Sequence, residues 1–178
     1  MKMKMKTRWS RSFTLIELMA VVAVIAILAG LVLGGAGAVR SRAARGQAKA
    51  EIASIEAALA RFYADMGDYP IQTSCLERTN YNPSPSVPGY STAGRLLFSN
   101  LWGAATYGAP RGGKQYIQVK PSMVSTSGTA HFFIDPWGYA YGYYWSGTNS
   151  LYGGAVPDVW STGGGTARAA TNKWLTSW

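Results

Sequence analysis

The sequence predicts an α+β protein in which one long N-terminal helix packs on a small antiparallel β-sheet near the C-terminus. Two observations predict the helix: residues 18–39 carry no charged or strongly polar side chain, and residues 40–66 are rich in helix formers. A third predicts the sheet, because residues 131–178 are rich in aromatic residues and divided by turn formers. A chain of 178 residues has room for one modest domain beyond the apolar segment.

The net charge of +9 is concentrated near the N-terminus. Residues 1–49 contain nine Lys or Arg and one acid, whereas residues 50–178 contain eight Lys or Arg and seven Asp or Glu. The body is therefore almost neutral and has no basic stripe to contact phosphate groups, which argues against nucleic-acid binding. The basic residues flank the apolar segment instead, where anionic lipid head groups attract them.

The basic residues 1–12 and the apolar run that follows allow three interpretations. They can form a secretory signal peptide cut after Ala36-Gly37-Ala38, a plain membrane anchor, or a leader peptide removed on the cytoplasmic side. The run of 22 residues is long enough to cross a bilayer as a helix. Glu17 at its edge favours the third interpretation, because a carboxylate there costs free energy and gives a signal peptide or anchor nothing in return.

The segment Ser12-Phe13-Thr14-Leu15-Ile16-Glu17-Leu18 resembles the class III signal of type IV pilins and type II secretion pseudopilins. The resemblance implies that a prepilin peptidase cleaves between Ser12 and Phe13 and methylates the new amino group of Phe13. It also implies that Glu17 neutralises the terminal amine of a neighbouring subunit during filament assembly. Residues 1–12 would then be the leader and residues 13–39 the transmembrane and filament-core helix. The chain departs from the family at Ser12, where the family nearly always has Gly.

Small residues recur along the predicted helix. Ala26, Gly30 and Gly34 lie four residues apart and form a ridge that lets helices approach closely in lipid or in a filament core.

Residues 40–66 continue the helix as an amphipathic half, and Gly67 ends it. The apolar stripe of this half, at spacings of three, four and three, consists of Ile52, Ile55, Leu59 and Phe62.

The rest of the chain divides into a variable region and a β-rich region. Residues 67–130 are expected to be mostly loop, above all the Pro-rich residues 82–89, with a short helix possible at 96–102. Residues 131–178 are expected to form a β-meander and a C-terminal tail. Strands are expected at 131–134, 139–145 and 156–161, with turns at 135–138 and 146–149.

Several of these segments, in order, resemble the major pseudopilin of type II secretion. They are Phe62-Tyr63 through Gly67-Asp68-Tyr69-Pro70, then Asp135-Pro136-Trp137-Gly138, then Pro157-Asp158-Val159-Trp160-Ser161, with Trp174 or Trp178 near the end. The resemblance implies a pilin-like fold and a structural subunit, single-pass in the bacterial inner membrane with its C-terminal domain in the periplasm. Such subunits assemble with themselves, other pseudopilins and an inner-membrane assembly platform into a periplasmic pseudopilus that drives secretion. The family's final loop binds calcium through acidic residues, but residues 163–178 contain no Asp or Glu, so neither calcium nor another cofactor is expected.

Other functions remain open from the sequence. A type IV pilus subunit for adhesion or motility shares the N-terminal motif, although the single cysteine, Cys75, cannot close the disulfide loop common in adhesive pilins. An anchored or exported carbohydrate-binding module would use aromatic side chains as platforms, with Tyr139, Tyr141, Tyr143 or Trp145 as candidates. An enzyme is disfavoured, because one histidine cannot build a His-based metal cluster and no phosphate-binding loop follows a strand.

Overall fold

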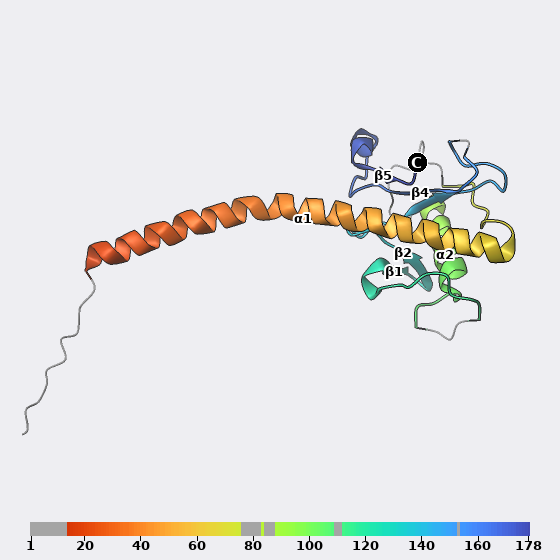
Figure 1. Ribbon diagram of the computed structural model, residues 1–178, viewed down its shortest axis with the longest axis horizontal. Helices are drawn as coiled ribbons and strands as arrows, with labels where there is room; N and C mark the ends of the chain where they lie inside the picture. Colours follow the sequence, from red (N-terminus) through yellow and green to blue (C-terminus); the bar gives the residue numbers. More distant parts are fainter. Residues whose placement is uncertain (1–13, 76–82, 84–87, 109–111, 153) are drawn as a thin grey trace, which may run out of the picture. The chain divides into compact units, whose positions relative to one another are not determined.

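The computed structural model describes residues 14–75, 83, 88–108, 112–152 and 154–178. Within these ranges, the side chains of residues 32–36, 88, 127, 168 and 169 are not described. The chain divides into two compact units, Met1–Ser41 and Arg42–Trp178, and one helix contributes to both. All the described strands lie in the second unit (Figure 1).

Helix α1 (Leu15–Met66) contributes an apolar stripe to the core of the second unit. Ile52, Ile55 and Leu59 are buried, and Phe62 is half-buried against the same cluster. The predicted amphipathic half of the helix is therefore confirmed.

Helix α1 ends where the sequence predicts it. Gly67 adopts a positive φ of 82°, and its N–H donates to the carbonyl oxygen of Tyr63 at 2.8 Å. This left-handed conformation is costly for a residue with a Cβ, so glycine is the residue that stops the helix without strain.

The variable region contains more regular structure than expected. Helix α2 spans Pro88–Trp102, so the expected loop over 82–89 is wrong at its last two residues. Pro88 occupies the first position of α2, where the missing N–H costs nothing because the first N–H groups of a helix have no intrahelical acceptor. A positive φ of 79° at Gly103 ends α2, as Gly67 ends α1.

Two small antiparallel sheets follow α2. The first pairs β1 (Val124–Ser127) with β2 (Ala130–Phe133), and the short 3₁₀-helix η1 (Pro121–Met123) precedes it. The second has the order β3 (Gly142–Tyr144), β4 (Asp158–Ser161) and β5 (Leu175–Thr176). The 3₁₀-helix η2 (Arg168–Lys173) lies between β4 and β5 in the chain.

The structure confirms the α+β arrangement, a long N-terminal helix followed by small antiparallel sheets, which is consistent with a pilin-like fold. It differs from the expected single meander in having two sheets, and an isolated bridge pairs Ile134 with Ala140 in the segment between β2 and β3. Strands β1 and β5 were not expected. The sequence of β1 is mostly Ser and Thr, and β5 has two residues, so neither has enough alternating apolar residues to be recognised.

The turn at residues 135–138 has the structure that its sequence predicts. One oxygen of Asp135, Oδ1, accepts hydrogen bonds from the backbone N–H groups of Trp137 and Tyr139, at 3.0 and 2.9 Å. Gly138 completes the turn with a φ of 84°. The other oxygen, Oδ2, accepts from Ser161 Oγ at 2.6 Å and so ties the turn to the end of β4.

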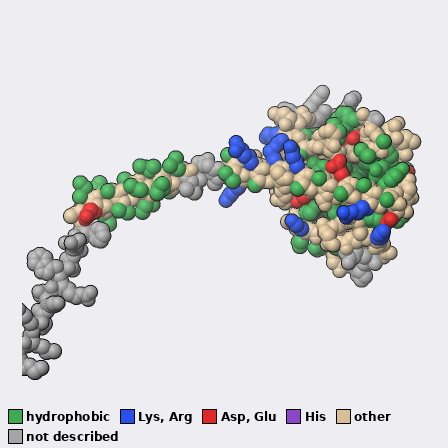
Figure 2. All heavy atoms as spheres, viewed as in Figure 1, with side chains coloured by type: hydrophobic (Ala, Val, Ile, Leu, Met, Phe, Trp, Pro, Cys, Tyr) green, Lys and Arg blue, Asp and Glu red, His purple; other side chains and the backbone are tan. Residues whose placement is uncertain are grey.

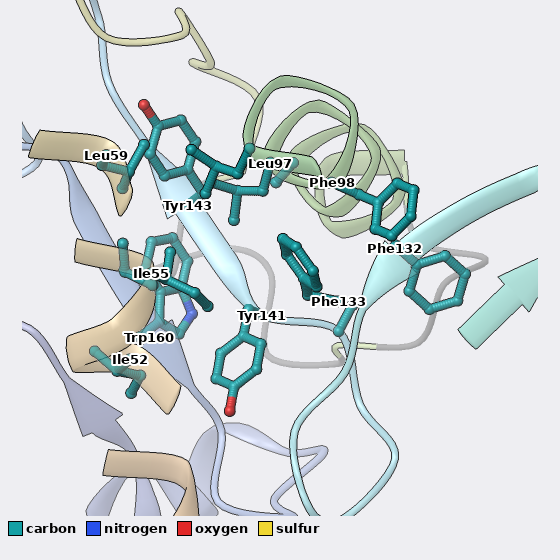
Figure 3. Packing of buried hydrophobic residues seen from close by; sticks show 14 of the residues in the cluster. Ile52, Ile55, Leu59, Leu97, Phe98, Phe132, Phe133, Tyr141, Tyr143 and Trp160 are labelled. Carbon is teal, nitrogen blue, oxygen red and sulfur yellow. The ribbon is translucent and has the colours of Figure 1, made fainter. Parts of the chain in front are cut away.

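The core of the second unit is rich in aromatic residues (Figure 3). Trp160 on β4 is fully buried, and its indole N–H donates to the hydroxyl of Tyr90 on α2 at 2.9 Å. The residue paired with it across the sheet is Gly142. A methyl group at this glycine would overlap the indole ring, so the ring occupies the space that a side chain would need.

The aromatic residues considered as a sugar-binding platform belong to this core. Tyr141 and Tyr143 are fully buried, and Trp145 is 5% exposed. The hydroxyl of Tyr141 donates to Glu51 Oε2 at 2.6 Å, and that of Tyr143 donates to the carbonyl oxygen of Pro70 at 2.8 Å. These three side chains pack and cannot stack on a ligand at the surface, while Tyr139 is half-buried.

Candidate functional site at the start of the long helix

The residues predicted to act in processing and assembly lie at the N-terminal end of α1. Ser12 and Phe13 lie outside the described residues, so their predicted roles in cleavage and methylation remain predictions. Thr14 is the first described residue, and Glu17 stands in the first turn of the helix. Both side chains are exposed.

Thr14 and Glu17 form a reciprocal cap on the helix. The backbone N–H and the hydroxyl of Thr14 both donate to Glu17 Oε2, each at 2.8 Å. In return the N–H of Glu17 donates to Thr14 Oγ1 at 3.4 Å. This is the capping-box arrangement, in which two backbone N–H groups at a helix start find acceptors in side chains.

The cap gives Glu17 a role within its own helix that the sequence analysis missed. A threonine followed three residues later by glutamate, directly before an apolar run, was the available signal. The capping box contains only residues 14–17, so cleavage between residues 12 and 13 leaves it intact. Glu17 therefore does not depend on a partner in another chain to have hydrogen bonds.

The cap uses only one of the two oxygens of the Glu17 carboxylate. Both bonds from Thr14 go to Oε2, and Oε1 accepts no hydrogen bond from any residue that the structure describes. A carboxylate can accept about four hydrogen bonds, so Glu17 can hold its own helix start and still accept from an amine. The geometry thus makes the two roles compatible.

The first unit presents apolar side chains to its surroundings on every side of α1. Large aliphatic side chains from Leu15 to Leu31 are between 55% and 76% exposed, and Figure 2 shows hydrophobic side chains along the visible face of this part of the helix. Ala26 is exposed, and a methyl group at Gly30 would meet no atom within 4 Å. The surroundings of Gly34 are not described. In the part of the chain that was searched, namely the described residues, no helix is both long and apolar enough to cross a membrane.

The buried carboxylates that the structure describes in the second unit have hydrogen-bond partners. Glu51, Asp135 and Asp158 are buried, and each carboxylate accepts hydrogen bonds from the fold: Glu51 from Tyr141 and Gln47, Asp135 from its turn and Ser161, and Asp158 from the N–H of Leu151. His131 stacks on Phe98, with ring centroids 5.8 Å apart. Among the described residues, no group of three or more His, Cys, Asp or Glu side chains is placed to hold a metal ion.

The burial of Asp135 leads to a prediction about pH. Burial raises the pKa of Asp135 above its ordinary value of 3.8, although hydrogen bonds from Ser161 and from the turn lower it. The folded state therefore binds this proton more tightly than the unfolded state, and the associated stability is lost as the pH rises through the folded pKa. An Asp135→Asn variant keeps an oxygen for the two turn N–H groups but has no proton to lose.

We expect the free energy of unfolding of the wild type, relative to that of Asp135→Asn, to fall as the pH rises from about 4. Urea unfolding of residues 42–178 at a series of pH values measures the difference. A difference that stays constant, or that grows with pH, would show that the carboxylate is not held in a desolvated site.

Residues 10–33 match the family described as the prokaryotic N-terminal methylation motif. No curated protein and no solved structure matches the chain. The match covers Ser12, Phe13 and Glu17 together with the first part of α1, and it does not extend into the second unit. The motif fits a membrane-anchored protein that a prepilin peptidase processes and that assembles into a filament, a structural role rather than a catalytic one. The chain carries the N-terminal methylation motif of the prokaryotic pilin and pseudopilin type.

Proposed function

We propose that this chain is a pseudopilin, a subunit that is held in the bacterial inner membrane and then assembled into a periplasmic pseudopilus that drives protein secretion by a type II-like system. The observation that carries the proposal is the capped, exposed Glu17 at the start of an apolar helix, within a matched methylation motif. Removal of residues 1–12 would place the methylated amine of Phe13 about one helical turn from Glu17. The same two groups, on neighbouring subunits, would form the assembly contact.

The exposed apolar surface of α1 supports the membrane and filament stages. Side chains such as Leu18, Val22 and Ile25 are more than half exposed, and water is an unfavourable solvent for so continuous an apolar surface. Lipid covers such a surface before assembly, and the helices of neighbouring subunits cover it in a filament core. Ala26, Gly30 and Gly34 would let those helices approach closely.

The choice of a secretion pseudopilus over a pilus rests on the second unit. The Asp135 turn has the structure that its pseudopilin-like sequence predicts. Cys75 is buried and free, and burial raises the pKa of its thiol to about 12, so very little of the thiolate needed for disulfide formation exists at neutral pH. Deletion of the gene from its source organism separates the alternatives. Loss of exported proteins from the medium supports secretion, and loss of surface fibres with normal export supports a type IV pilus.

The experiment that tests processing is N-terminal analysis of the mature protein. Expression with a prepilin peptidase should give a chain that begins at N-methylated Phe13, because the matched motif, residues 10–33, spans the predicted cut. Intact mass and N-terminal sequencing measure this directly. Ser12→Gly should be cleaved at least as fast as the wild type, since it restores the residue usual in the family.

A mature chain that begins at residue 39 would contradict the proposal. It would mean that a signal peptidase had cut after Ala38 and removed the apolar run, leaving nothing to form a filament core. An uncleaved chain made with an active peptidase would contradict it as well.

A further inference from the structure

The surface of the second unit contains an open cavity of about 690 Å³. Helix α2 forms one wall with residues 92–99, and the end of the β1–β2 hairpin forms another with residues 129–131. Ala105 and Thr106, after α2, also line it. The volume falls in the range of small-molecule binding sites.

The walls of the cavity are held in place by close packing beneath it. Helix α2 packs on β2, and a methyl group at Gly94 would lie 2.9 Å from the Cβ of Phe132. Phe98 and Phe132 are fully buried, and His131, at the cavity wall, stacks on Phe98. The cavity therefore lies between two elements that share a rigid core, and it is largely formed before any ligand arrives.

The described lining residues are rich in hydroxyl groups and include one permanently charged side chain, Arg95. Four lining residues are Ser or Thr, and Arg95 is exposed at the wall. No Asp or Glu is among the described lining residues, and the guanidinium of Arg95 forms no ion pair with a described carboxylate. His131 adds an imidazole whose Nδ1 is buried and has no hydrogen-bond partner among the described residues.

We propose that this cavity binds an acidic sugar, with Arg95 holding its carboxylate. A guanidinium binds a carboxylate through two parallel hydrogen bonds, which makes it the residue suited to this group. The hydroxyls of Thr92, Ser99, Thr106 and Thr129 can donate to and accept from the sugar hydroxyls. Leu96 and the two alanines supply apolar contact for the C–H groups of the ring. The site does not use the buried aromatic residues of the core, and it does not depend on the proposed function.

His131 provides a local probe, because the chain contains a single histidine. Titration of the full chain in detergent with D-glucuronate should shift the ring resonances of His131 in a ¹H–¹³C spectrum and approach saturation. D-Glucose has the same ring with no carboxylate, and it should bind about tenfold more weakly, the loss expected for a charge-assisted hydrogen bond at an exposed site. Inorganic phosphate, an anion without sugar hydroxyls, should also bind more weakly than glucuronate.

Two variants that each lose one positive charge distinguish binding at the cavity from a general effect of net charge. Arg95→Gln should weaken glucuronate binding about tenfold and leave the rest of the spectrum unchanged. Lys120→Gln removes an exposed charge outside the cavity and should leave the affinity unchanged. The proposal is overturned if glucuronate does not shift the His131 signals, if glucose or phosphate binds as tightly, or if Arg95→Gln binds like the wild type.

Discussion

Filaments should be lost, or reduced to a small fraction of the wild-type yield, when Glu17 is replaced by Gln. Glutamine can still accept the hydrogen bonds from Thr14, because Gln serves at this position of a capping box. It has no charge to offer the amine of an incoming subunit, which would then be buried unpaired in a medium of low dielectric constant. A pair of charges 4 Å apart is worth about 4 kcal/mol at an effective dielectric constant of 20, so the expected loss is large.

Comparison of Glu17→Gln with Glu17→Ala separates the charge from the cap. Glu17→Ala removes both the charge and the acceptor for the two Thr14 donors, whereas Glu17→Gln removes only the charge. If the charge drives assembly, Gln and Ala variants should both fail, while membrane insertion and cleavage before Phe13 continue normally. Sheared-filament yield, membrane fractionation and N-terminal analysis measure the three steps. A Gln variant that assembles like the wild type while Ala fails would reduce Glu17 to a helix cap.

A large loss of stability is expected from Gly142→Ala, which adds a single methyl group. The added methyl group would overlap the indole of Trp160, which is fully buried and tied to Tyr90 by a hydrogen bond at 2.9 Å. Either the ring moves and breaks that bond, or the paired strands β3 and β4 separate. We expect a loss of about 1–3 kcal/mol or more in the free energy of unfolding of residues 42–178, measured in urea.

A control and a double variant make this prediction specific. Gly112→Ala places a methyl group in open space and should change stability by less than about 0.5 kcal/mol. Trp160→Ala alone should cost about 3–5 kcal/mol, as expected for removal of a large aromatic core residue. The two changes at positions 142 and 160 should cost less together than their sum, because the methyl group has no ring to meet. If the two losses of stability simply add, the overlap between the methyl group and the indole ring does not destabilise the protein.

Local patterns in the sequence were sufficient to predict the long helix and its end. The apolar stripe of α1 has helical spacing, and Gly67 supplies the conformation that stops it. The turn at Asp135 could be predicted in the same way, because the Asp135 side chain accepts hydrogen bonds from backbone N–H groups two and four residues away. Each of these features is encoded within a few residues.

Features that depend on distant parts of the chain were harder to predict. Strand β1 contains little apolar alternation and exists because β2 pairs with it. Strand β5 has two residues and depends on the edge of β4. The start of α2 was missed for another reason: Pro88 was interpreted as a loop residue, although proline is also favoured at the first position of a helix.

The same distinction applies to the candidate sites. The motif around Glu17 is contiguous, so sequence alone located it, and its cap with Thr14 was within reach of the same reasoning. The cavity beside Arg95 is made from α2, the loop after it and the β1–β2 hairpin. No pattern in the sequence brings these three segments together, and the tertiary structure was needed to find it.

The pairing of β5 has a consequence for the stage of synthesis at which the second unit can fold. Strand β4 gains its outer neighbour only when residues 175–176 are present, and Arg45 near the start of the second unit donates to the carbonyl oxygen of Lys173 at 3.2 Å. Val159 and Ser177 exchange two further hydrogen bonds, each 3.0 Å long. During synthesis this sheet therefore stays incomplete until residues 175–177 have left the ribosome, because β4 has no partner on this side before then.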